Sequence, residues 1–275
     1  MTALKSPELG DSPVALAARP RPVTPRIALL DIGAITKRNL LRILRTPRLL
    51  VFSSIQPVMF VLLFRYVFAG AIHAPGSSYV DYLMPGIFVQ TALFGGASTA
   101  VGLASDLRGG IIDRFRSLPM ARSAVLAGRT IADLIRNVVV LLLMVVVGVL
   151  VGFRFHGTVG TDIAGLAMVL LFGYAFSWVF ATIGLIVKDP ETAQVAGFLP
   201  LFPLVFASSA FVPVHSMPGW LQAFANVQPV SVTVDATRAL VTGGPVEHWL
   251  WQSLVWAVGI LVLFALLAVR QYRKV

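Results

Sequence analysis

The residues best suited to chemistry lie in a short charged segment between two long apolar runs, DLRGGIIDRFRSLPMAR at 106–122. Its glycines allow a sharp turn, and the next residues can form a short helix that a proline ends. An aromatic ring among arginines is typical of protein-binding hot spots. We therefore expect this segment to dock a soluble partner; the alternative is that its aromatic ring dips into lipid and its arginines contact phosphates. The residues expected to take part are Gly109, Gly110, Ile112, Asp113, Arg114, Phe115, Arg116 and Pro119.

The sequence offers no set of residues for catalysis, for a metal or for a bound cofactor. It contains no cysteine, its four histidines are scattered, and no HExxH motif occurs. Asp81, Asp162, Asp235 and Glu247 form no recognisable acid pair, which disfavours a membrane enzyme. No GxxxxGK(S/T) motif occurs either, so the chain itself should hold no ATP.

Composition indicates a membrane protein. Of the 275 residues, 57% are hydrophobic and 12% are charged, with a mean hydropathy of +0.84, whereas about a quarter of the residues in a soluble domain are charged. The apolar residues gather in runs long enough to cross a bilayer as helices, which takes about 20 residues each. The net charge of +10 comes from cations that flank these runs. It therefore indicates orientation in the membrane rather than nucleic-acid binding.

The expected fold is an all-α integral membrane protein with six transmembrane helices in the cell membrane. Residues 1–26 should form a disordered cytoplasmic tail, and 27–275 should form one transmembrane domain. Most cations fall on the side of the tail and the even-numbered loops, so both termini should be cytoplasmic. The expected elements are an amphipathic elbow helix at 28–46, spans at 49–69, 82–104, 131–153, 163–187, 193–212 and 249–269, the docking segment at 106–122, and an outer re-entrant segment at 213–248.

The elbow helix should lie in the membrane interface. At 100° per residue, Arg38, Arg42 and Arg45 fall on one narrow arc with Asp31, while leucines and isoleucines spread over the other side. The apolar side should face the lipid, and the cationic side should face lipid phosphates or a protein partner. Pro47 should break the chain before the first span.

The outer segment is too apolar for a solvated loop and too broken for a single span. Pro213, Pro218 and Pro229 stand among many apolar residues. We therefore expect a pair of short helices that dip back into the outer leaflet against protein, where irregular backbone is tolerated.

Polar residues inside the spans need a physical reason. Arg65 can snorkel to the outer interface or contact a polar substrate headgroup. Asp133 and Arg136, spaced i,i+3, should pair with each other. The small residues at 95–99 indicate close helix packing or a substrate path at a dimer interface, and the aromatic residues at 172–180 indicate packing or lipid-facing surface rather than a drug-binding cage. The residues that would line a substrate path are Gln90, Ser98, Thr99 and Arg65.

Three stretches carry a family resemblance. They are the elbow helix, DLRGGIIDRFRSLPMAR followed by AGRTIADLIRN, and MPGWLQAFANVQPVSVTVDATRAL before the last span. From about Ile27 to the C-terminus, the chain resembles the permease subunit of an ABC-2 type exporter, in the branch that includes daunorubicin-resistance permeases. The usual Asn-Pro pair of that family is Gln228-Pro229 in this sequence.

The resemblance implies half of a transporter, a permease subunit that has no ATPase domain of its own. A separate ABC ATPase subunit would bind ATP and Mg and dock on 106–122, with two permeases (a homodimer being expected) and two ATPases per complex, among membrane lipids. The implied substrate is a lipophilic drug or lipid, which fits an apolar, uncharged interior; a polysaccharide or glycolipid is the alternative. An ion-coupled secondary transporter is disfavoured because the span centres carry no carboxylate and no internal repeat is evident.

Overall fold

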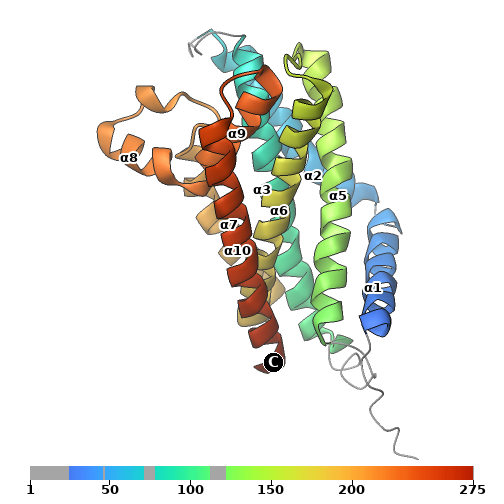
Figure 1. The fold of residues 1–275 in the computed structure, drawn as a ribbon. Helices are drawn as coiled ribbons and strands as arrows, with labels where there is room; N and C mark the ends of the chain where they lie inside the picture. The colour runs from blue at the N-terminus through green and yellow to red at the C-terminus, as the bar shows by residue number, and fades with distance from the viewer. Residues whose placement is uncertain (1–24, 46, 71–77, 112–121, 275) are drawn as a thin grey trace, which may run out of the picture.

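The computed structural model describes residues 25–45, 47–70, 78–111 and 122–274, and within these ranges the chain is helical with no strand. The all-α class is therefore confirmed. The elements are α1 (Pro25–Arg45), α2 (Pro47–Leu63), the π-helical η1 (Phe64–Phe68), α3 (Tyr79–Arg108), α5 (Arg122–Val151), α6 (Val159–Val187), α7 (Pro190–Phe206), the 3-10 turn η2 (Val214–Ser216), α8 (Gly219–Val227), α9 (Pro229–Thr242) and α10 (Glu247–Lys274). Figure 1 shows them as one bundle, from which α8 projects to one side.

Four described helices, α3, α5, α6 and α10, are long and apolar enough to cross a membrane. They correspond to the predicted spans at 82–104, 131–153, 163–187 and 249–269, although α5 already begins at Arg122. The first predicted span falls on α2 and η1, whose described side chains include the apolar stretch Ser54–Phe68. The fifth falls on α7, which has 17 residues. As predicted, one helix ends before Pro47 and another follows: α1 ends at Arg45, and α2 begins at Pro47.

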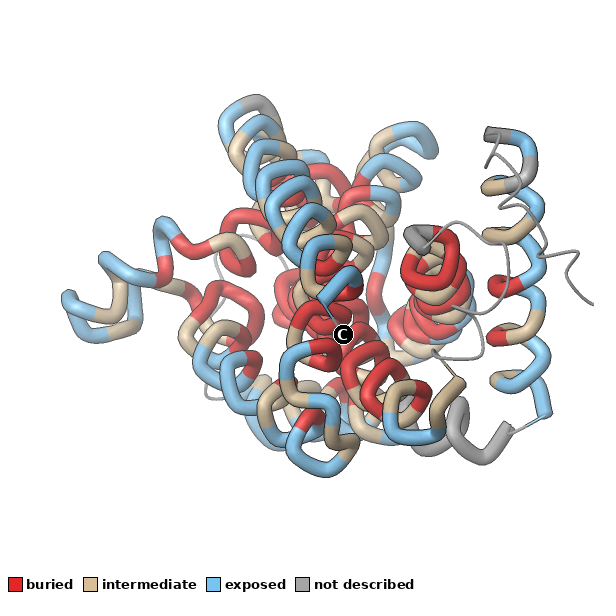
Figure 2. Tube along the Cα trace, turned by 90° about the horizontal axis from the view of Figure 1, so that it is seen from below, coloured by how far each residue is buried: buried red, intermediate tan, exposed pale blue. Residues whose placement is uncertain are grey.

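Helices α3 and α6 form the centre of the molecule. Most of α3 is buried, and small residues bring it close to α6. A Cβ added at Gly184 would lie 2.5 Å from the carbonyl oxygen of Ala100, and one added at Gly173 would lie 2.8 Å from the Cβ of Ala92. The two helices are therefore in direct contact at two levels, without a layer of larger side chains between them. Figure 2 shows the buried residues gathered at this centre.

Helix α1 lies at the edge of the molecule beside α5 (Figures 1 and 2). A Cβ at Gly128 of α5 would lie 2.7 Å from the Cβ of Ile35, and Thr36 Oγ1 donates a hydrogen bond to the Gly128 carbonyl at 3.2 Å. The arginines of the predicted cationic arc do not all face lipid or a partner. Arg38 and Arg42 reach back into this chain, toward α3.

Gln228 joins the end of α7 to the start of α9. Its Nε2 donates to the carbonyls of Leu204 and Ala207 at 2.9 and 3.0 Å. These carbonyls lie where the last turn of α7 leaves acceptors without helical donors, so α7 ends at Phe206 and not near residue 212 as predicted. Pro229 then begins α9, at the N1 position that suits proline. The outer segment thus contains the two short helices that were expected, α8 and α9.

Candidate functional site

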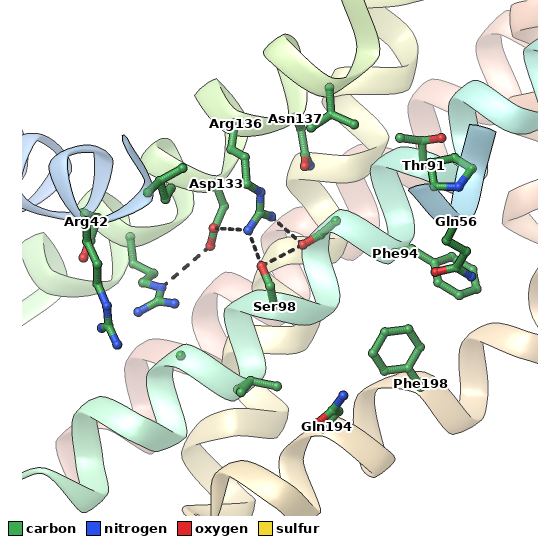
Figure 3. A pocket seen from close by; sticks show the side chains of 18 of the residues that line it. Arg42, Gln56, Thr91, Phe94, Ser98, Asp133, Arg136, Asn137, Gln194 and Phe198 are labelled. Carbon is green, nitrogen blue, oxygen red and sulfur yellow. Dashed lines mark hydrogen bonds and ion pairs between the residues drawn. The ribbon is translucent and has the colours of Figure 1, made fainter. Parts of the chain in front are cut away.

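A cavity of about 540 Å³ lies among α1, α2, α3, α5 and α7. Figure 3 shows that its two ends differ: aromatic and amide side chains gather at one end, and charged side chains at the other. The first end is formed by Gln56, Thr91, Phe94, Gln194 and Phe198, the second by Arg42, Asp133 and Arg136, with Ser98 and Asn137 between them.

One face of α3 lines the cavity along much of the helix. The residues that do so at steps of three or four, the spacing of one helix face, are Gln90, Phe94, Ser98, Val101 and Ser105. On the other face of the small-residue cluster, a Cβ at Gly96 would lie 3.0 Å from the ring of Phe180 on α6. The cluster at 95–99 is therefore divided between helix packing and the cavity wall.

A buried ion-pair network forms the charged end. Asp133 on α5 pairs with Arg136 at 3.2 Å and with Arg129 at 3.8 Å, and it accepts a hydrogen bond from Thr99 Oγ1 at 2.6 Å. The predicted pairing of Asp133 with Arg136 is confirmed. Arg136 also donates to Ser98 Oγ and to the carbonyl of Gly95 on α3, so this pair fixes α5 against α3.

Asp106 extends the network to α3 and α1. Its side chain is 5% exposed and pairs with Arg129 at 3.2 Å, Arg42 at 3.4 Å and Arg38 at 3.6 Å. Arg129 thus bridges Asp106 of α3 and Asp133 of α5. The expectation of an uncharged interior is wrong here. Burying a carboxylate is costly unless it is paired, and the arginines, distant in sequence from Asp106, provide the pairing.

Two buried amides that line the cavity have an atom without a hydrogen-bond partner. They are Oε1 of Gln90, an acceptor, and Nδ2 of Asn39, a donor. An unsatisfied buried polar group costs about 1–3 kcal/mol. A bound molecule that supplied the missing donor or acceptor would recover part of this free energy. Among the described residues, no cluster of His, Asp or Glu could hold a metal ion.

The structure describes only the beginning of the predicted docking segment. As predicted, α3 ends at the two glycines: the N–H of Gly109 donates to the Ser105 carbonyl at 2.9 Å, and Gly110 has a φ of +65°, which glycine adopts without strain. The remaining docking residues lie outside the described part of the chain: Ile112, Asp113, Arg114, Phe115, Arg116 and Pro119.

An exposed ion pair connects the end of α3 to the start of α7. Arg108 lies 3.3 Å from Asp189, which caps α7 by accepting hydrogen bonds from the N–H and hydroxyl of Thr192 at 2.9 and 2.8 Å. These hydrogen bonds, and to a smaller extent the charge of Arg108, lower the pKa of the Asp189 carboxyl. The loop that follows α6 is thus tied to the helix that leads into the docking segment.

The residues proposed for a substrate path do not all lie together. Gln90 and Ser98 line the cavity. Thr99 is not among the lining residues, and its hydroxyl donates a hydrogen bond to Asp133. Arg65 lies apart, in η1, where its Nε is enclosed without a hydrogen-bond partner. Arg45, at the end of α1, is exposed.

The sequence interpretation missed the aromatic end of the cavity. Of the aromatic residues at 172–180, which it assigned to packing or to a lipid-facing surface, Phe172, Phe176 and Phe180 are buried in the core, as packing requires. The residues that it overlooked, Phe94 and Phe198, each follow a glutamine by four positions. This Gln-x3-Phe spacing places the two side chains near one helix face, but it does not distinguish a cavity wall from a packed core.

Comparison with known proteins gives consistent similarities. The chain matches the family described as ABC-2 type transporter over residues 31–242, from within α1 to the end of α9. It is 34% identical over 228 residues to the daunorubicin resistance ABC transporter permease protein DrrB1 of Streptomyces coeruleorubidus, covering 83% of this chain and 81% of that protein. It is 30% identical over 241 residues to the probable doxorubicin resistance ABC transporter permease protein DrrC of Mycobacterium tuberculosis, covering 87% of each. It is 26% identical over 217 residues to the putative transport permease ycf38 of Pyropia yezoensis, covering 76% and 73%.

Proposed function

The chain belongs to the ABC-2 type transporter family, and we propose that, as the permease subunit of an ATP-driven exporter, it moves a lipophilic drug or a lipid out of the cytoplasm or the inner leaflet. The observation that supports this best is its similarity, over most of its length, to permeases named for daunorubicin and doxorubicin resistance. The cavity adds support, because an aromatic end and a charged end suit an amphiphilic molecule.

ATP and Mg would be bound by a separate ATPase subunit that docks on residues 106–122. In support, the two charged residues at the described start of this segment, Asp106 and Arg108, are both held by ion pairs. Asp106 connects to α1 and α5 through its arginines, and Arg108 connects to the start of α7 through Asp189. A displacement of the docked segment would therefore pull on the helices that surround the cavity.

The proposed topology has six spans, with both termini in the cytoplasm. Helix α2 with η1 would be the first span, α7 the fifth, and the four long helices the others. Helices α8 and α9 would re-enter the outer leaflet, and α1 would stand beside the cytoplasmic part of α5, along which it runs in Figure 1. In support, the starts of α1 and α5 and the C-terminus lie at the same end of the bundle in Figure 1.

The first test is purification of the full chain from its native membranes in mild detergent, with mass spectrometry of the proteins that copurify. We expect an ATPase with a Walker A motif, and a complex mass that fits two copies of the chain and two ATPases. The complex is then reconstituted into vesicles, and uptake of doxorubicin on ATP addition is compared with uptake of a glycolipid. A stable complex without an ATPase would refute the proposed class, and transport of the glycolipid alone would refute the proposed substrate.

A further inference from the structure

A second hollow of the molecule, an open groove of about 550 Å³, follows helix α1 where it stands beside α5. The α1 residues that line it range from Leu29 to Leu44, which is about 22 Å of helix at 1.5 Å per residue. Leu40 of α1 and Ile131 of α5 belong to the same wall. The groove is thus a long apolar channel at the edge of the molecule, separate from the cavity described above.

The cations of α1 divide between the inside of the chain and this groove. Arg38 and Arg42 pair with Asp106 of α3. Lys37 lines the groove instead; it is exposed and has no ion pair among the residues that the structure describes. No acidic side chain lines the groove. The groove therefore combines an apolar wall with a positive charge that this part of the chain does not balance.

The groove leads onto the outer apolar face of α5. Beyond Ile131 that face continues at steps of three or four residues, the spacing of one helix side, through Ile135, Val139, Leu142 and Val146, which are 39% to 56% exposed. Only 28% of the most apolar stretch of α5 is buried, against 72% of that of α3. In a membrane protein such a face meets the acyl chains of lipids.

Gly33 keeps the groove open in the middle of α1. A Cβ added there would have no atom within 4 Å, whereas one added at Gly128, where α5 packs against α1, would lie 2.7 Å from the Cβ of Ile35. Gly33 therefore serves no close contact within the described chain, although glycine is unfavourable inside a helix. Because this position has no side chain, the groove has room for a flexible apolar chain.

We propose that the groove binds one anionic phospholipid of the cytoplasmic leaflet. One acyl chain lies in the groove and continues along the apolar face of α5, and the ammonium group of Lys37 pairs with the headgroup phosphate. Anionic lipids are attracted by exposed cations at that surface, whereas a zwitterionic headgroup carries its own balancing cation. A lipid suits the groove better than a protein does, because the groove continues into a face that meets hydrocarbon. The inference rests on the proposed topology for the choice of leaflet, and it does not depend on which substrate is exported.

The test measures how tightly the full chain, purified in mild detergent with the proteins that copurify, retains phospholipids in native mass spectrometry. Phosphatidylglycerol and phosphatidylcholine with the same acyl chains are compared. We expect the wild type to retain phosphatidylglycerol about fivefold more tightly, Lys37→Gln to lose this preference and Lys37→Arg to keep it. Gly33→Leu, which fills the groove, should weaken retention of both lipids. The matched control is Lys274→Gln, which removes an exposed cation at the end of α10 and should keep the preference.

A photoreactive lipid tests the position of the acyl chain. Phosphatidylglycerol with a diazirine in one acyl chain, added to the same preparation, should label α5 within residues 131–146 of the wild type. Gly33→Leu should reduce this labelling, because its new side chain occupies the groove that leads onto α5.

Four outcomes would overturn the inference. Retention of neither lipid by the wild type would show that the groove holds no lipid. An equal preference in the wild type and Lys37→Gln would place the headgroup elsewhere. Labelling of 131–146 that Gly33→Leu leaves unchanged would show lipid on α5 without any role of the groove. Loss of a copurifying protein from either variant, with lipid retention unchanged, would make the groove a protein-docking surface. The proposed export function is tested separately, by ATP-driven export from vesicles.

Discussion

Gly102 on α3 faces the guanidinium group of Arg129 on α5 so closely that a Cβ added at Gly102 would lie 1.6 Å from Nη2 of Arg129. The missing side chain leaves the space through which Arg129 reaches both Asp106 and Asp133. The network that joins α1, α3 and α5 therefore depends on a glycine in the middle of a helix, where glycine is otherwise unfavourable.

Gly102→Ala should reduce ATP-driven export severalfold while the protein remains inserted. The new methyl group displaces the Arg129 guanidinium, and the bridge between the two carboxylates is lost. Helix propensity alone would favour alanine by about 1 kcal/mol. The matched control is Gly259→Ala on α10, where nothing lies within 4 Å of the added Cβ. Export rates in vesicles, normalised to protein amount, compare the two, and equal rates would contradict the prediction.

Asp106→Asn should lower the free energy of unfolding by about 2–4 kcal/mol, because Arg129, whose side chain is 14% exposed, then keeps only the more distant Asp133 as a carboxylate partner. We expect a value near the lower end of this range, because Arg38 and Arg42 are partly exposed and water screens their pairs with Asp106. Thermal unfolding of the purified chain can be followed by its tryptophan fluorescence. Asp189→Asn, which breaks the exposed pair with Arg108, is the comparison and should leave the transition nearly unchanged. Transitions shifted equally in both variants would show that burial of Asp106 does not matter.

Phe115→Ala should abolish ATP-dependent export and leave insertion and abundance unchanged, because it removes the ring expected to enter the ATPase groove. Export and copurification of the ATPase are measured together. Phe224→Ala, on the exposed helix α8, is the control and should retain both. Normal export by Phe115→Ala would remove the docking role from this residue.

The cap of α7 should be insensitive to pH over the physiological range. Hydrogen bonds from Thr192 lower the pKa of Asp189, so the carboxylate contributes stability above its unfolded pKa of about 3.9, and this is lost only as pH falls through the lower folded value. Hydrogen exchange at the Thr192 amide, corrected for its intrinsic rate, should show constant protection from pH 8 to pH 5. Asp189→Asn should keep protection, since asparagine caps equally well. Loss of protection between pH 7 and pH 5 in the wild type would contradict this.

The long helices could be predicted from the sequence because each is a continuous apolar run, and the pairing of Asp133 with Arg136 could be predicted because both residues lie one turn apart on one helix. The partners of Asp106 could not. Arg42 lies 64 positions away from it in the sequence, and only the packing of α1 against the bundle brings the two together. The early end of α7 has the same origin, since Gln228, whose side chain binds the last carbonyls of α7, lies between α8 and α9.

A series of phenylalanine rings, Phe60 and Phe64 on α2 and η1 with Phe202 and Phe206 on α7, could not be identified from the sequence either, although its four-residue spacing is present there. Such spacing is equally typical of helices that pack in a core. What distinguishes this series is that the rings of two helices meet beside a cavity and stay partly exposed. The spacing shows that the rings share one face of a helix. Only the tertiary structure shows whether that face packs in the core or lies beside a cavity.

The direct contacts of Gly184 with Ala100 and of Gly173 with Ala92 have a mechanical consequence. Because close-packed interfaces do not slide or twist without clashes, α3 and α6 behave as one rigid spine. A transporter must expose its cargo first to one side of the membrane and then to the other. We expect such a motion to involve the other helices that line the cavity, among them α2 and α7, rather than the contact between α3 and α6.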